Sequence, residues 1–178
     1  MKKRFKFKTT YYHPQHKEAF TIDELSRMEQ KGDLILDPEY QRGSIWAAKK
    51  KYPLVDSILA GYPIPPIYLG KRKDGRRVIW NCIDGQQRLR ALLDFYRGKG
   101  FEGNKGFKIK QESSSTIIID SSYVNLTYKE LDSTQQNIFQ NHKVNCIVVQ
   151  AKDEAYAQEL EEELYQRLNS NVDKVNDQ

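Results

Sequence analysis

The chain has 178 residues, of which 38% are hydrophobic and 30% are charged, so it is long enough to form one domain with its own buried core. Its two cysteines, Cys82 and Cys146, lie in separate apolar stretches, which argues against a disulfide framework or a zinc site. Neither a signal peptide nor an apolar run of membrane-spanning length is visible, so we expect a cytoplasmic protein with no membrane partner.

The net charge of +5 conceals an uneven distribution along the chain. Residues 1–110 carry 24 Lys and Arg against 12 Asp and Glu, whereas residues 111–178 carry 5 against 12. A basic half of this kind favours a partner that bears phosphate, either a nucleotide or DNA, over a neutral small molecule. Any single basic cluster, taken alone, is better explained as a solvated surface.

The N-terminal part of the chain contains one clear helix signal. Residues 1–20 alternate aromatic and basic side chains and fit either an arm or an edge strand, so we place the domain over residues 21–178. Thr21 and Glu24 have the spacing of a capping box, which predicts a helix that begins at Thr21 and ends at Gly32. A short apolar strand is expected at residues 34–36.

The middle of the chain predicts a helix followed by a hairpin. Apolar residues at helical spacing favour a helix over residues 46–59, which Pro53 either kinks or divides. Residues 61–66 are too rich in Gly and Pro for a helix, and strands are expected at 67–69 and 78–83. Asp74-Gly75 suits the central positions of a tight turn between these two antiparallel strands.

The stretch from Cys82 to Leu93 changes from strand-like to helical periodicity. Leu89, Leu92 and Leu93 have the spacing of one helix face, whereas the residues before Asp84 are β-branched and aromatic. Asp84 is expected to cap the helix with its carboxylate, and Gly85 would let a ligand approach the backbone. Free N–H groups at such a strand-to-helix corner attract anions, although an ordinary capped helix with solvated polar residues fits the pattern equally well.

The last third predicts two strands and two helices. Strands are expected at residues 116–120 and 144–149, a helix capped by Asp132 or Ser133 should run through Phe139, and a long helix should start at Asp153. The acidic residues of the long helix, Glu159 and 161–163, are interpreted as a solvated face and not as a metal site.

Four segments together resemble one protein family. They are Asp84-Gly85-Gln86-Gln87-Arg88, the element at 38–46 with Tyr40-Gln41-Arg42 and Trp46, the stretch 54–67 with Ser57-Ile58-Leu59 and Pro63-Ile64-Pro65, and Arg167-Leu168-Asn169 near the end. In this order they resemble the DGQQR-motif N-terminal domain of GmrSD-type restriction endonucleases, a branch of the ParB/sulfiredoxin-like superfamily. The resemblance covers about residues 32–171.

The resemblance implies an α+β, ParB/sulfiredoxin-like fold with a small mixed sheet and surrounding helices. It also implies a domain that binds a nucleoside triphosphate with Mg²⁺, with or without hydrolysis, and regulates restriction of DNA in anti-phage defence. The nucleotide-binding residues it implies are Tyr40, Gln41, Arg42, Asp84, Gly85, Gln86, Gln87, Arg88 and Asn169, with Asp84 as metal ligand and as catalytic group.

Two other functions fit parts of the sequence. One is a ParB-like DNA-binding module without enzymatic activity, in which the basic part contacts phosphate backbones. The other is a metal-dependent nuclease, which usually needs more carboxylate ligands than Asp84 alone. No His, Asn and Asp constellation of a nuclease is visible, so we expect DNA cleavage only with a C-terminal nuclease domain or partner subunit.

Overall fold

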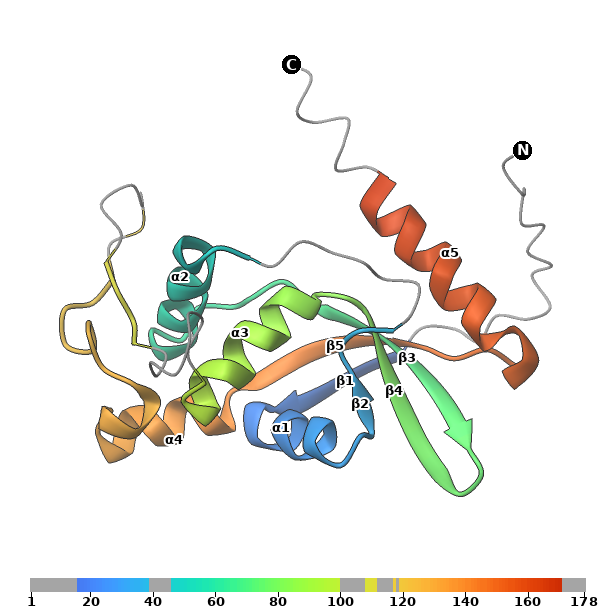
Figure 1. The fold of residues 1–178 in the computed structure, drawn as a ribbon, viewed down its shortest axis with the longest axis horizontal. Coiled ribbons are helices and arrows are strands. Elements are labelled where there is room, and N and C mark those ends of the chain that lie inside the picture. The colour runs from blue at the N-terminus through green and yellow to red at the C-terminus, as the bar shows by residue number, and fades with distance from the viewer. Residues whose placement is uncertain (1–15, 39–45, 100–107, 112–116, 118, 171–178) are drawn as a thin grey trace, which may run out of the picture.

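A computed structural model describes residues 16–38, 46–99, 108–111, 117 and 119–170 of the chain (Figure 1). The described part contains one five-stranded mixed sheet in the order β1-β5-β3-β4-β2, together with five α-helices. This arrangement confirms the expected α+β class. The elements are β1 His16–Thr21, α1 Ile22–Gln30, β2 Leu34–Ile35, α2 Ala48–Leu59, β3 Ile67–Asp74, β4 Arg77–Asp84, α3 Gln86–Arg97, α4 Ser133–Asn141, β5 Lys143–Val149 and α5 Ala157–Ser170.

The sheet is built around the hairpin of β3 and β4. These two strands are antiparallel, β5 lies parallel to β3 on one side, and β2 lies parallel to β4 on the other. β1 pairs antiparallel with β5 and forms one edge of the sheet. β4, whose end leads into α3, is therefore an interior strand paired on both sides.

Helices cover both faces of the sheet. Alternate residues of a strand point to opposite faces, and here both faces carry apolar side chains. On one face, Trp80 and Cys82 of β4 belong to the main core, which also receives apolar side chains from α1, α2, α3 and α4. On the other face, Ile83 packs with Leu160 of α5 in a second, smaller core. Figure 1 shows α5 apart from the group of α1 to α4.

Several local predictions are confirmed. Thr21 and Glu24 form a capping box at the start of α1, and Gly32 follows the helix with a φ of +73°. Asp132 caps α4 in a second capping box, with Gln135. Cys82 and Cys146 are buried free thiols, and burial raises the pKa of each, that of Cys146 to about 12.

Two local predictions are wrong. The described residues of the stretch 116–120, which are Ile117, Ile119 and Asp120, lie outside any strand, so a β-branched run alone did not determine the conformation. In the hairpin, the two turn residues are Gly75 and Arg76, one position later than expected. Only Gly75 has a positive φ, +60°, and a glycine in the first central position is typical of a type II′ turn.

The acidic face of α5 is also not simply solvated. Glu161 is only 2% exposed, and its carboxylate accepts hydrogen bonds from Arg72 at 2.8 and 2.5 Å and from Asn81 at 2.9 Å. Gly70 of β3 provides the space, since a Cβ there would lie 2.2 Å from Oε1 of Glu161. This buried polar contact holds α5 against the hairpin.

Within the described residues, no helix is long and apolar enough to cross a membrane.

Candidate functional site

The corner between β4 and α3 is made by Gly85. β4 ends at Asp84, α3 starts at Gln86, and Gly85 between them is the N-cap with a φ of +92°. A Cβ at this position would lie 2.4 Å from Cδ1 of Ile67, so the corner excludes a side chain by conformation and by space. Gly85 and Gln86 are buried, whereas Asp84, Gln87 and Arg88 beside them are half-buried, so only this flank of the corner reaches the protein surface.

The start of α3 leaves backbone donors available. The first backbone hydrogen bond of this turn is from the Leu89 amide to the Gly85 carbonyl, at 3.0 Å, and no described side chain caps the helix. The amides of Gln86, Gln87 and Arg88 therefore have no hydrogen-bond acceptor among the described residues. Orphan amides at the positive end of a helix dipole are suited to an anion.

The expectation that Asp84 caps α3 is wrong. Asp84 is still part of β4, and Gly85, in the left-handed conformation, occupies the N-cap position in its place. The Asp84 carboxylate instead accepts a hydrogen bond from Arg88 through Oδ2, at 2.8 Å. Its other oxygen, Oδ1, has no hydrogen-bond partner in the described part of the chain.

Arg88 is more strongly bound to the protein than the sequence indicated. Its side chain is 14% exposed, and besides the ion pair with Asp84 it donates to the carbonyls of Pro65 and Pro66, at 2.8 and 3.2 Å. The guanidinium thus ties the Pro-rich segment before β3 to the end of β4 and to α3. Arg88 positions the corner and also places a positive charge beside the free amides.

Gln87 and Arg90 of α3 bind described residues that lie on either side of segment 39–45. Oε1 of Gln87 accepts a hydrogen bond from the Trp46 amide at 3.1 Å, and Arg90 forms an ion pair with Asp37. Tyr40, Gln41 and Arg42, expected to contact the nucleotide, lie outside the described residues. The sequence reasoning missed the structural roles of Gln87 and Arg90, which their i, i+3 spacing on α3 could have suggested.

The polar face of α3 continues to Asp94, seven residues after Gln87. Asp94 is opposed by Lys51 of α2, which is only 4% exposed. Burial raises the pKa of Asp94 and lowers the pKa of Lys51, and the charge of each residue partly counteracts the shift of the other. Gln87, Arg90 and Asp94 therefore form one polar face of α3, whose partners are Trp46, Asp37 and Lys51 of α2 in turn.

Asn169 is not joined to the corner by any contact of the described residues. Its Nδ2 donates to the Tyr165 carbonyl, one turn earlier in α5, at 2.8 Å. A protein-built metal centre is also not indicated, because the described residues contain no group of three or more His, Cys, Asp or Glu able to hold an ion.

Comparison with known proteins identifies the family. The model of the GmrSD restriction endonuclease N-terminal domain matches residues 22–178, which is most of the chain. No curated protein and no solved structure matches. The match confirms the resemblance carried by the four sequence segments, and its first residue coincides with the start of α1. This chain belongs to the family of GmrSD restriction endonuclease N-terminal domains.

Proposed function

We propose that this domain binds the phosphates of a nucleoside triphosphate at the corner between β4 and α3, and thereby regulates a restriction endonuclease that acts in anti-phage defence in the cytoplasm. The observation that carries the proposal is the start of α3. The amides of its first three residues have no hydrogen-bond acceptor among the described residues. A phosphate group supplies the oxygen acceptors that these amides lack.

Each polar residue of the corner has a separate role in the proposal. The amides of Gln86 and Gln87 contact the phosphates directly. Arg88, oriented by Asp84 and two proline carbonyls, contributes positive charge from a fixed position. Further contacts to the nucleotide are assigned to Tyr40, Gln41 and Arg42 in segment 39–45. One more is assigned to Asn169 in the last turns of α5.

Mg²⁺ fits the corner as an ion carried by the nucleotide. This ion is commonly held by one or two carboxylates together with phosphate oxygens and water. Asp84 is 32% exposed, and no described residue bonds its Oδ1, so it offers one such ligand while Oδ2 stays bonded to Arg88. Asp84→Asn keeps an acceptor for Arg88 and removes the charge. We expect this variant to lose the Mg²⁺ dependence of binding but to retain binding without Mg²⁺.

The experiment that tests the proposal is calorimetric titration of the purified chain with ATP, GTP, CTP and UTP, with and without Mg²⁺. Binding of at least one triphosphate in the micromolar to low millimolar range is expected, and phosphate release assayed in parallel shows whether the nucleotide is hydrolysed. If none of the four binds at millimolar concentration, the corner is structural and the proposal is wrong.

A second candidate is contact with DNA, which the β3–β4 hairpin favours. Lys73 and Arg76 are exposed at its tip, and Arg77 beside them is partly neutralised by Asp33. Two or three phosphate contacts of this kind give weak, strongly salt-dependent binding. Binding to duplex DNA that weakens steeply with salt and is unaffected by nucleotide would support it. In either case, cleavage belongs to a C-terminal nuclease domain or partner subunit.

A further inference from the structure

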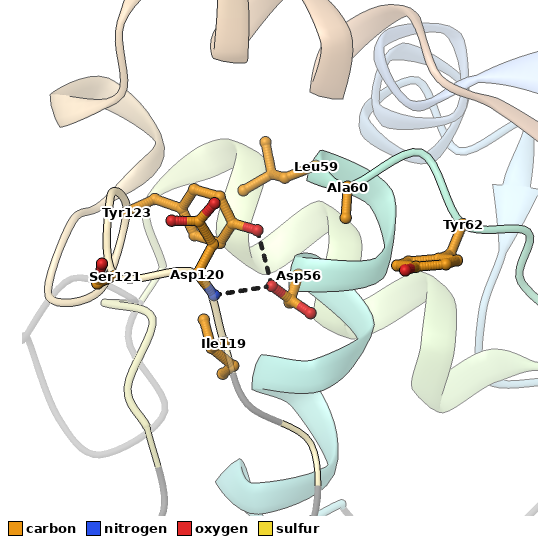
Figure 2. A pocket seen from close by; sticks show the side chains of 8 residues that line it. All are labelled: Asp56, Leu59, Ala60, Tyr62, Ile119, Asp120, Ser121 and Tyr123. Carbon is orange, nitrogen blue, oxygen red and sulfur yellow. Dashed lines mark hydrogen bonds between the residues drawn. The ribbon is translucent and has the colours of Figure 1, made fainter.

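A pocket lies at the C-terminal end of α2, and none of the described residues that line it belongs to the corner. Its volume is about 490 Å³, and it lies between the end of α2 and residues 119–123 (Figure 2). Asp56, Leu59 and Ala60 line it from the α2 side, Tyr62 from the segment that follows, and Asp120 and Tyr123 from the opposite side.

The charge of this pocket is negative, in contrast to the net charge of the chain. Among the described residues that line it, Asp56 and Asp120 are acidic, and none is Lys, Arg or His. Leu59 is the last residue of α2 and Ala60 is its C-cap, so the negative end of the helix dipole lies at the pocket wall. The pocket therefore disfavours phosphate and attracts a cation.

Asp56 supplies a carboxylate of which one oxygen is not hydrogen-bonded to any described residue. The residue is 7% exposed, and its Oδ1 accepts hydrogen bonds from the Tyr123 hydroxyl at 2.7 Å and from the Asp120 amide at 3.4 Å. Figure 2 shows the other oxygen, Oδ2, pointing away from these two donors, and no described residue donates to it. Burial, and then the bond to Asp56, raises the pKa of Tyr123, so this hydroxyl stays a neutral donor. A carboxylate oxygen in a buried side chain is satisfied best by a charged N–H donor.

Tyr62 adds an aromatic surface to the same pocket. It is 63% exposed although its backbone is held, since its amide donates to the Ser57 carbonyl at 2.7 Å. Burial in the protein core thus does not explain the position of this ring. The face of a tyrosine ring attracts organic cations.

We propose that this pocket binds an organic cation that carries a primary ammonium or guanidinium group. The cation donates to Oδ2 of Asp56, lies within the field of Asp120 and the end of α2, and stacks its alkyl or planar part on Tyr62. A bare metal ion suits the pocket less well, because the described residues there provide two carboxylates of which one oxygen is already bonded twice. The chemistry is shared by a lysine or arginine side chain and by a free polyamine.

The test is a titration of the full chain followed by amide chemical shifts in nuclear magnetic resonance spectra. The probes are arginine methyl ester and its isostere citrulline methyl ester, both acetylated at the α-amino group so that of the two only the arginine ester carries a charge, together with spermidine. Shifts concentrated at Leu59, Ala60, Tyr62 and Asp120 are expected with the two cations, and binding about tenfold weaker or more with citrulline methyl ester. The tighter of the two cations identifies whether the natural ligand resembles a protein side chain or a polyamine.

Two variants and one control complete the test. Asp56→Asn removes the charge but keeps an oxygen for the Tyr123 hydroxyl, and Tyr62→Ala removes an exposed ring. Both are expected to lower the affinity for arginine methyl ester about tenfold. Asp74→Asn, on the exposed hairpin, is expected to leave the affinity unchanged. If Asp56→Asn does not fold, the Tyr62→Ala variant and the comparison with the citrulline ester still test the proposal. The proposal is overturned by equal binding of the charged and neutral esters, by wild-type affinity in Tyr62→Ala, or by shifts spread over the whole surface.

Discussion

Replacing Gln87 by Glu separates phosphate binding at the corner from the stability of the corner. Oε1 of Gln87 accepts a hydrogen bond from the Trp46 amide at 3.1 Å, and a glutamate has an oxygen in the same place. The new charge lies in the first turn of α3, where a carboxylate stabilises the helix by about 0.3–1 kcal/mol. The variant is therefore expected to unfold at the same or a slightly higher denaturant concentration than the wild type.

The same charge opposes phosphate at the start of the helix. For two like charges about 7 Å apart near a protein surface, the repulsion is of the order of 1–2 kcal/mol, which corresponds to roughly a tenfold loss of triphosphate affinity or more. Calorimetric titration with the triphosphate that the wild type binds best measures this loss. The loss should shrink as salt is added, because part of the interaction is screened.

The matched control for this substitution is Gln135→Glu. Gln135 lies in the first turn of α4, accepts a hydrogen bond from the Asp132 amide at 3.2 Å, and receives the same added charge at another helix start. It should gain comparable stability and keep the wild-type triphosphate affinity. Equal affinity of the wild type and Gln87→Glu would refute the reasoning, as would an equal loss in both variants. Gly85→Ala and Arg88→Ala are less informative, since both also disturb the packing of the corner.

Three further predictions concern stability. Glu161→Ala leaves Arg72 without its buried partner and should lower the free energy of unfolding by about 3 kcal/mol in urea denaturation, whereas Glu162→Ala, one residue later and part of an exposed contact, should change it by less than about 0.5 kcal/mol. Gly70→Ala should destabilise the wild type, because its Cβ would overlap the Glu161 carboxylate, but should cost clearly less in the Glu161→Ala background; equal costs would show that the contact does not matter. Burial lowers the pKa of His142 below its unfolded value near 6.5, so the unfolded chain takes up the proton first and stability should decrease as the pH falls from about 7 to 5. Urea midpoints of His142→Gln should lack that part of the pH dependence, and an identical pH profile for wild type and variant would contradict the assignment.

The elements that are determined by residues close together in the sequence were predicted well. The capping box of Thr21 and Glu24 and the period of Leu89, Leu92 and Leu93 are determined within one or two helical turns, and both helices formed where expected. Gly85 was also recognised as a corner from the residues around it. Such signals come from backbone conformation and local hydrogen bonds, which a short stretch of sequence contains.

The contacts that the sequence did not reveal join residues far apart in the chain. Glu161 looked like part of a solvated acidic face, because its partner Arg72 lies 89 residues away and on a strand. Arg88 looked free to bind phosphate, although its acceptors Pro65 and Pro66 are fixed by the path of another segment. Asp84 was expected at the N-cap of α3, but the N-cap is the next residue, Gly85. Charge and spacing therefore suggested candidate residues, and tertiary packing determined which of their groups remain available.

Phosphate binding at the start of α3 is tested most directly by titrating the isotope-labelled chain with inorganic triphosphate. The backbone amide chemical shifts are the readout. Because this probe has no base or sugar, it reports on the phosphate contacts alone. Saturable shifts that are largest at the amides of Gln86, Gln87 and Arg88 are expected. Shifts confined to the basic hairpin around Lys73 and Arg76, or no saturable shifts at millimolar concentration, would contradict this expectation.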